Sequence, residues 1–336
     1  MRSILAPAPA HPVEPGPIPT FSVILAVYHA AETVGEAVES ALRQSAPPHE
    51  VLVCDDGSTD GTQAALAPYR ERITLLRKDH GGAASARNAA ARAATADFLA
   101  ILDADDVYLP DRLAALGELA AARPDLDILA SDAFFEVEGR TAGRFNSDRH
   151  PFAVADQRGA ILERNFILGN AAVRRERLVA IGGFDESLEC AEDWDCWIRL
   201  ILGGSLAGSV VEPLARYRIR RQSLTSDRRI ALRCRVRALE KVERRSDLSP
   251  EEGRTLERSL LAHRQRAALA EAEAAILERE PYARRRAMAI AVGGGHGFGT
   301  RLKAALAAAA PRLAARMLER RKARSDRLTR VPEGVP

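Results

Sequence analysis

Three acidic side chains stand almost side by side in the segment Leu102-Asp103-Ala104-Asp105-Asp106. Carboxylates packed so closely repel one another, and a bound cation would relieve the repulsion. Hard carboxylate oxygens suit Mg²⁺ or Mn²⁺, and substrate phosphates commonly complete the coordination of these ions. We therefore expect this acidic cluster to bind a divalent metal. The alternative is a purely structural loop.

A second acidic pair, Asp55-Asp56, directly follows the apolar run 51–54 and opens the segment DDGSTDG. A carboxylate at this position could accept a hydrogen bond from the N–H of a nucleotide base. The alternative is a turn that opens a helix, in which Asp, Gly and Ser are all common.

A glycine pair precedes a helical pattern in the segment 80–88, HGGAASARN, which also carries Arg87. Glycines before a helix allow the backbone to approach a phosphate, and the helix N-terminus favours negative charge. The segment is not the dinucleotide-binding fingerprint, which should follow the first strand, where this chain has Ala26-Val27-Tyr28-His29. A flexible turn before a helix is the alternative.

The fourth segment is Glu192-Asp193-Trp194, which is acidic and begins an amphipathic helical pattern over 194–202. In the context of the other three segments, Asp193 is our candidate for a general base. Taken alone, an acid in a first helical turn is also explained by its favourable interaction with the helix dipole.

These segments need a scaffold, and the chain shows one from Phe21 onward. Apolar runs at 21–27, 51–54, 73–76 and 98–102 alternate with helical patterns at 32–43, 61–69 and 83–94. Such alternation predicts βαβ units and a mainly parallel sheet in the α/β class. In such sheets ligands bind beyond the carboxyl ends of the strands, and the acidic segments at 55–56 and 103–106 fall at these ends.

The pattern also divides the chain into three parts. We expect a disordered, proline-rich leader over 1–19 and a catalytic α/β domain over 20–226, with further strands at 127–131 and 169–173 and a helix between Pro110 and Pro124. The segment 132–168 gives no clear assignment. Residues 227–336 are rich in Ala, Leu, Glu and Arg and predict a helical appendage.

The composition is that of an ordinary soluble globular protein, with 46% hydrophobic and 28% charged residues and a formal net charge of +3. No apolar run is long enough for a membrane span. Basic residues gather at 216–245, with 12 Lys/Arg against 3 Asp/Glu, and at 301–330, with 10 against 2. Solvated helix faces explain this charge, and a surface for anionic lipid or acceptor phosphates is the alternative. We expect no nucleic acid partner and a cytoplasmic location, with peripheral contact at the inner face of the membrane left open.

Taken together and in this order, the four segments resemble glycosyltransferase family 2 over residues 21–225. The resemblance implies a GT-A fold, which is Rossmann-like with helices on both faces of the sheet. It also implies metal-dependent, inverting transfer of a sugar from a nucleoside diphosphate donor, most commonly UDP, to a hydroxyl group. The acceptor would be a saccharide, a lipid-linked molecule or a protein, in cell-surface polysaccharide, glycolipid or glycoprotein synthesis.

The resemblance also suggests roles for individual residues. Asp193 matches the catalytic base, and Asp103 and Asp105 match the DxD motif, with Asp105 as the direct metal ligand. One position departs from the family, because Arg220 stands where the family often has histidine; arginine pairs with phosphate but is a poor metal ligand. The implied nucleotide contacts are Ala26, Tyr28, Asp55, Asp56, Arg87 and Asp103, and the implied diphosphate or acceptor contacts are Glu192, Trp194 and Arg220.

Two other functions compete with this interpretation. An aspartyl phosphotransferase would use Asp103 as nucleophile and Asp105 as acid/base, but that motif normally follows the first strand of its fold. A non-catalytic protein that binds nucleotide-sugars or a membrane surface would keep the fold without turnover. The presence of Asp193 and both DxD acids argues against the second alternative.

Overall fold

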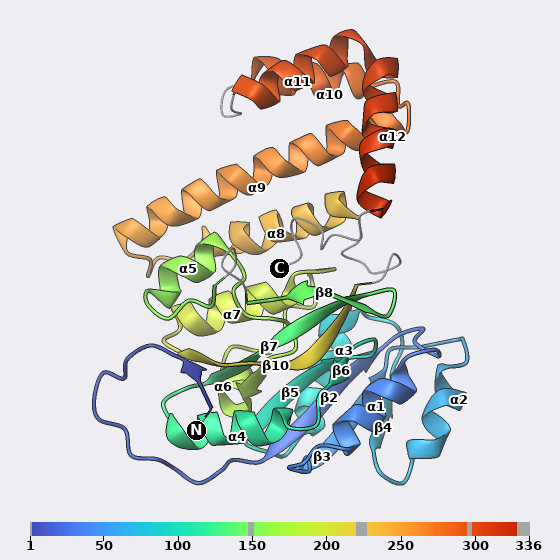
Figure 1. The fold of residues 1–336 in the computed structure, drawn as a ribbon. Coiled ribbons are helices and arrows are strands. Elements are labelled where there is room, and N and C mark those ends of the chain that lie inside the picture. The colour runs from blue at the N-terminus through green and yellow to red at the C-terminus, as the bar shows by residue number, and fades with distance from the viewer. Residues whose placement is uncertain (1, 147–150, 220–226, 294–297, 328–336) are drawn as a thin grey trace. The chain divides into compact units, whose positions relative to one another are not determined.

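The structure is a computed structural model that describes residues 2–146, 151–219, 227–293 and 298–327. It divides into two compact units, Met1–Arg220 and Arg221–Val335, which we call the catalytic unit and the helical unit. Figure 1 shows the sheet of the catalytic unit and the helices of the helical unit, and each is described here by itself.

One sheet runs through the catalytic unit in the order β1-β10-β7-β9-β5-β2-β3-β4, with β6 paired to β10 and β8 paired to β7. Helices pack on this sheet: α3 contacts β2 and β3, α1 contacts β3 and β6, and α4 contacts β7 and β10 (Figure 1). The strands are β1 Ile4–Leu5, β2 Phe21–Val27, β3 Glu50–Asp55, β4 Thr74–Arg77, β5 Phe98–Asp103, β6 Val107–Tyr108, β7 Ile128–Val137, β8 Arg140–Arg144, β9 Ala172–Arg174 and β10 Ala207–Ile219. The helices are α1 Val34–Leu42, α2 Thr62–Leu66, the short 3₁₀ helix η1 Ala67–Tyr69, α3 Ala83–Ala93, α4 Arg112–Ala122, α5 Gln157–Glu163, α6 Arg175–Ala180 and α7 Glu192–Leu202.

The half of the sheet that carries the first two acidic segments is parallel, as the sequence predicts. Strand β2 lies between β3 and β5 and runs parallel to both, and β4 continues the parallel order beyond β3. Central side chains of these strands, such as Ile24, Leu52 and Leu99, are almost fully buried, as expected for strands covered on both faces. The register sets Ala26 opposite both Cys54 and Asp103, so the carboxyl ends of β2, β3 and β5 share one edge.

The other half of the sheet is mixed and contains a strand that the sequence did not reveal. Strand β10 runs parallel to β7, whereas β9 runs antiparallel to both β5 and β7. The pairing of β10 with β7 shifts register on each side of Pro213. Proline cannot donate to a sheet ladder, and irregular pairing is how a strand accommodates it. This proline and the charged residues Arg216 and Arg218 obscure the strand pattern in the sequence.

The N-terminal segment contributes one short strand to the same sheet. Strand β1 pairs antiparallel with β10, with Ile4 opposite Val210 and Leu5 opposite Ser209. Two residues of the segment for which we expect disorder are therefore placed at the edge of the sheet.

The helical unit confirms the predicted change to helices after about residue 227. Its helices are α8 Arg228–Val242, α9 Pro250–Leu277, α10 Ala283–Val292, α11 Phe298–Ala309 and α12 Pro311–Arg327. Helix α9 begins with a capping box, in which the Ser249 side chain accepts from the Glu252 backbone and the Glu252 side chain accepts from Ser249. Within the parts of the chain described, no helix is both long enough and apolar enough to cross a membrane.

Asn88 of α3 fixes the loop that leads toward α7. Its Nδ2 donates to the carbonyl of Phe184 at 2.8 Å and to Oε1 of Glu186 at 2.9 Å, and its Oδ1 accepts from the Phe184 backbone N at 2.8 Å. Both Asn88 and Phe184 are buried. The loop before α7 is therefore held by the middle of α3, which is about one hundred residues away in the chain.

We predict that Asn88→Ala lowers the free energy of unfolding by about 2–4 kcal/mol, because buried backbone groups lose their partners. Urea denaturation followed by circular dichroism measures this change. Arg92→Ala is the control, since Arg92 lies on the same helix and is exposed, and we expect it to change stability by less than about 0.5 kcal/mol. A similarly small loss for Asn88→Ala would contradict the anchoring role.

Candidate functional site

The site lies at the shared edge of β2, β3 and β5, and three distant segments contribute to it. Strand β5 ends at Asp103, α3 carries Arg87, and α7 begins with Glu192 and Asp193. Contacts between the side chains of Arg87, Asp103 and Glu192 join these three elements.

Arg87 forms a bridge between two of the acids. Its NH2 donates to Oδ1 of Asp103 at 2.5 Å, and its NH1 donates to Oε1 of Glu192. The Arg87 side chain is buried, and its guanidinium lies 5.7 Å from the centre of the Phe184 ring. Burial opposes the charged form, but the two carboxylates outweigh it and raise the pKa of Arg87 above its usual value. The buried Arg87 therefore stays charged and neutralises part of the negative charge of Asp103 and Glu192.

Asp193, next to this bridge, has a raised pKa. Burial, with repulsion from Glu192, raises the pKa of Asp193 to about 6, and Arg87 acts in the opposite direction. Asn165 Nδ2 donates to Oδ2 of Asp193 at 3.1 Å. A Cβ atom added at Gly169 would lie 3.2 Å from the same oxygen, so the glycine leaves room for it. A partly exposed carboxyl with such a pKa is suited to general-base chemistry.

The acidic turn after β5 separates its three carboxylates by environment. Asp103 and Asp105 are partly exposed, whereas Asp106 is buried and accepts from the Arg218 backbone N at 2.9 Å. Burial, with repulsion from Asp103 and Asp105, raises the pKa of Asp106 well above its usual range. Asp106 is therefore part of the packing beneath the turn, and Asp103 and Asp105 are the two acids that remain accessible.

The turn offers two carboxylates to a metal. Across the described ranges, no three His, Cys, Asp or Glu side chains come together as a ligand set. Mg²⁺ is commonly held by one or two carboxylates together with substrate phosphates and waters. The donor set of Asp103 and Asp105 fits such an ion, and it does not fit an ion that needs a closed cage of protein ligands.

Asp55 and Asp56 are buried and organise the loops around them. Asp56 accepts from the backbone N of Gly81 and of Gly82, at 3.0 and 2.7 Å, and from Lys78 Nζ at 2.9 Å. Asp55 accepts from the Ser58 backbone N at 2.9 Å and from the Gln63 side chain. The glycine pair singled out in the sequence is thus attached to Asp56, and the role of this acid in base binding stays a prediction.

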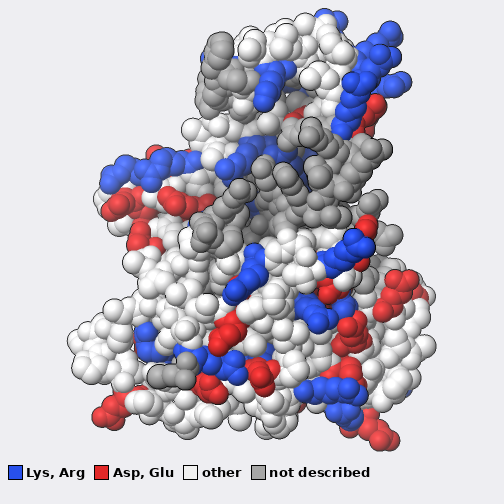
Figure 2. Space-filling view, viewed as in Figure 1, with Lys and Arg blue, Asp and Glu red and all other residues white. Residues whose placement is uncertain are grey.

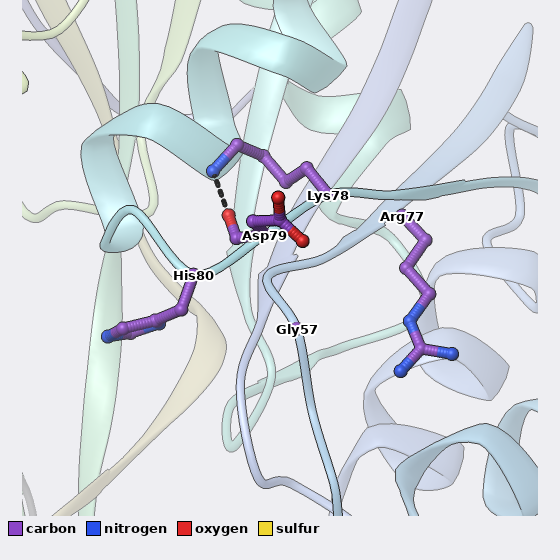
Figure 3. A pocket seen from close by; sticks show the side chains of 5 residues that line it. All are labelled: Gly57, Arg77, Lys78, Asp79 and His80. Carbon is purple, nitrogen blue, oxygen red and sulfur yellow. Dashed lines mark hydrogen bonds between the residues drawn. The ribbon is translucent and has the colours of Figure 1, made fainter.

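Tyr28 presents an aromatic surface at the end of β2. Its side chain is 46% exposed and stacks between two imidazoles, with ring centres 4.0 Å from His29 and 4.1 Å from His80. His80 also lies in the lining of an open hollow of about 720 Å³ with Gly57, Arg77, Lys78 and Asp79. Figure 3 shows Arg77 and His80 on opposite sides of Gly57 in this hollow. Polar and cationic groups thus border the aromatic surface.

Two of the predicted diphosphate or acceptor contacts, Trp194 and Arg220, are not among the accessible groups that the structure describes at the site. Trp194 is almost fully buried, and its Nε1 donates to the carbonyl of Ile161 at 2.8 Å, so it packs beneath the site. Arg220 lies outside the described residues. Sequence reasoning did not single out Asn165, because this residue falls in the segment 132–168, where no local pattern was assigned.

The chain is similar in sequence to known glycosyltransferases. The sequence model of glycosyl transferase family 2 matches residues 22–182. The putative glycosyltransferase EpsE of Bacillus subtilis strain 168 is 30% identical over 226 residues, which are 63% of this chain and 76% of EpsE. The chain belongs to glycosyltransferase family 2. The resemblance drawn from the four segments is confirmed.

Two further proteins are similar to this family 2 glycosyltransferase, one in sequence and one in fold. The succinoglycan biosynthesis protein ExoO of Rhizobium meliloti strain 1021 is 33% identical over 224 residues, and the match spans 60% of each chain. The mannosyltransferase PcManGT of Pyrobaculum calidifontis, solved in complex with GDP-Man and Mn²⁺, aligns with a TM-score of 0.59 at 23% identity. That alignment covers 94% of this chain and 87% of PcManGT. The GT-A fold class is confirmed.

We predict that Arg87→Gln destabilises the glycosyltransferase by about 3–5 kcal/mol, because it leaves Asp103 and Glu192 without their shared cation. Urea denaturation at pH 7.5 measures the loss, and Arg92→Gln on the same helix is the matched control. The loss should shrink at low pH, where both acids are neutral and need no partner. An equal loss of stability at pH 7.5 and at low pH would contradict the electrostatic role of the bridge.

Proposed function

We propose that this glycosyltransferase moves a sugar from a nucleoside diphosphate donor to an acceptor hydroxyl with inversion, and that Asp193 is the general base. The observation that carries the proposal is the partly exposed Asp193 carboxyl, whose pKa is raised to about 6, beside the bridge from Arg87 to Asp103. A base that is ionised at neutral pH but not strongly acidic is what proton removal from a hydroxyl needs.

The proposed reaction needs a single displacement. Asp193 removes the proton of the acceptor hydroxyl while the acceptor oxygen bonds to the anomeric carbon. The bond from that carbon to the diphosphate breaks on the opposite face, and the nucleoside diphosphate leaves with the electron pair. No covalent sugar intermediate forms, so one carboxylate is sufficient. Asn165, which donates to Oδ2 of Asp193, orients the base.

Asp103 and Asp105 would hold a divalent metal, Mg²⁺ or Mn²⁺, at the donor diphosphate. Such an ion supplies positive charge where the departing diphosphate gains negative charge. PcManGT, which shares the fold, was solved with Mn²⁺. One oxygen of Asp103 is engaged by Arg87, and the resemblance to the family assigns Asp105 as the more direct ligand.

The donor nucleotide would lie along the edge of β2 and β3. The Tyr28 ring supports a contact with a base through its exposed edge, because its two faces stack on His29 and His80. The backbone of Ala26 and the loops that Asp55 and Asp56 organise lie next to it. UDP-sugars are the family's commonest donors, whereas PcManGT was solved with GDP-Man. We propose a UDP-sugar as the first donor to test and a GDP-sugar as the second.

The acceptor is proposed by class. ExoO acts in succinoglycan biosynthesis by its name, which supports a saccharide or a lipid-linked saccharide in polysaccharide synthesis. The rival phosphotransferase needs an unencumbered nucleophile at Asp103, but this carboxylate is paired with Arg87. The non-catalytic alternative is addressed by the variant at Asp193 below.

We predict that calorimetric titration with UDP, GDP, dTDP and ADP, with and without Mn²⁺, finds binding of one nucleotide that strengthens with metal. Asp105→Ala should weaken this metal-dependent binding by at least about tenfold, through loss of a ligand. Glu71→Ala, at an exposed acid elsewhere in the catalytic unit, should leave it unchanged. Binding that ignores both Mn²⁺ and Asp105 would contradict the metal site.

A separate prediction concerns the base. Asp193→Asn should lower transfer by about 10² to 10⁴-fold while donor binding is retained, because the amide cannot accept the proton. Wild-type transfer should be constant above pH 7 and should fall about tenfold per pH unit well below pH 6, as the carboxylate becomes protonated. Radiolabelled or coupled sugar-transfer assays measure both effects.

Glu189→Gln is the control for that variant, since Glu189 is an exposed acid shortly before α7. It should keep full activity and the same pH profile. Full transfer by Asp193→Asn would overturn the assignment of the base, and a total lack of transfer by the wild-type protein with every donor would favour the non-catalytic alternative.

A further inference from the structure

The last three helices of the helical unit expose most of their large apolar side chains and bury alanines instead. Helices α10, α11 and α12 pack against each other and against α9 largely through alanines, with Ile276 and Ile290 as the larger buried side chains. Their large apolar side chains are instead mainly exposed: Met288 49%, Val292 69%, Leu302 50%, Leu306 62%, Leu313 59% and Met317 64%.

The first two helices of the same unit show the ordinary pattern and serve as an internal comparison. On α8 and α9, Leu232, Leu239, Leu256 and Leu260 are each at most 5% exposed. The inversion is therefore a property of α10 to α12 and not of the whole unit.

The exposed side chains form stripes at helical spacing. Met288 and Val292, Leu302 and Leu306, and Leu313 and Met317 are each four residues apart on their own helix, so each pair shares a face. On α12 the buried Ala315 faces the core, and the exposed Arg316 and Arg320 lie beside Leu313 and Met317 on the outward side. The outward face of α12 is thus both apolar and basic.

Charge on these helices is mainly positive. Residues 283–327 contain twelve Lys or Arg and two Asp or Glu, so acids within these helices cannot neutralise most of the cations. Figure 2 shows mainly blue side chains with little red over α12. Long basic side chains beside large apolar ones are typical of helices that lie in the interface of an anionic membrane.

We propose that α10 to α12 form a docking surface for an anionic lipid bilayer. Leu313 and Met317 of α12 enter the boundary between headgroups and acyl chains, and the neighbouring Arg316 and Arg320 bind the lipid phosphates. The inference is independent of the transfer reaction, because none of these residues lies in the catalytic unit.

The composition of the surface argues against two other partners. A second copy would bring an equally basic face against this one, and like charges oppose such contact. Nucleic acid would be attracted by the charge, but its phosphates make no use of exposed leucines and methionines, and single strands need aromatic rings to stack on. An anionic bilayer uses both the charge and the apolar stripes.

The test is flotation of the full chain with vesicles of phosphatidylcholine alone or mixed with an equal amount of phosphatidylglycerol. We expect binding to the anionic vesicles and little to the neutral ones. The double variant Leu313→Ala/Met317→Ala should weaken binding at least about tenfold, through lost apolar burial. Arg316→Gln/Arg320→Gln should weaken it about thirtyfold, through lost attraction to the lipid phosphates.

Val179→Ala is the matched control, because Val179 is 61% exposed but lies in the catalytic unit. It should bind as the wild-type chain does. Since all the substituted side chains are exposed, melting curves should coincide and separate docking from folding. Failure to float with anionic vesicles overturns the proposal. So does flotation that is insensitive to Leu313→Ala/Met317→Ala, or concentration-dependent dimerisation that the same variant abolishes.

Discussion

The arrangement of the site depends on one cation that is buried among acids. Arg87 pairs with Asp103 at the end of β5 and with Glu192 at the start of α7. Without it, two carboxylates from separate segments of the catalytic unit would repel each other in surroundings of low polarity, where such repulsion is strong. The guanidinium suits this position because its planar fork can bind two carboxylates at once and stays charged when buried.

The same cation also acts on the proton affinity of the proposed base. Burial and Glu192 raise the pKa of Asp193, and the Trp194 backbone N–H and Arg87 oppose them, so the resulting value of about 6 is a balance of these effects. Too little opposition would leave the base protonated at neutral pH, and too much would make it a weak proton acceptor. The residue that holds the acidic turn and α7 together thereby also tunes the chemistry of the residue next to Glu192.

The sequence predicted the parts of this site that are local, and missed the parts that depend on long-range pairing. The parallel strands β2, β3 and β5 and the acids at their ends follow from alternating patterns and short motifs. Strand β10 was missed because Pro213 and its register shifts break the pattern of a strand. The contact of Asn165 with Asp193 spans 28 residues of chain, and only the folded arrangement brings it about. Arg87 was named as a nucleotide contact, but its pairing with two acids has no local signal.

The helical unit shows the converse, because its composition predicted helices but not which of their faces is buried. Alanine and leucine both count as apolar, so spacing alone cannot say which of the two faces the core. Alanine cores let helices approach closely but bury little apolar surface. Each Å² of buried apolar surface contributes about 25 cal/mol to stability. Turning Leu313 and Met317 outward gives up much of that stabilisation in the isolated chain. In the catalytic unit, Arg87 is neutralised by acids from the same chain, whereas α10 to α12 leave an excess of cations and large apolar groups at their surface. A partner that is both anionic and apolar would satisfy that excess, and an anionic bilayer has both properties.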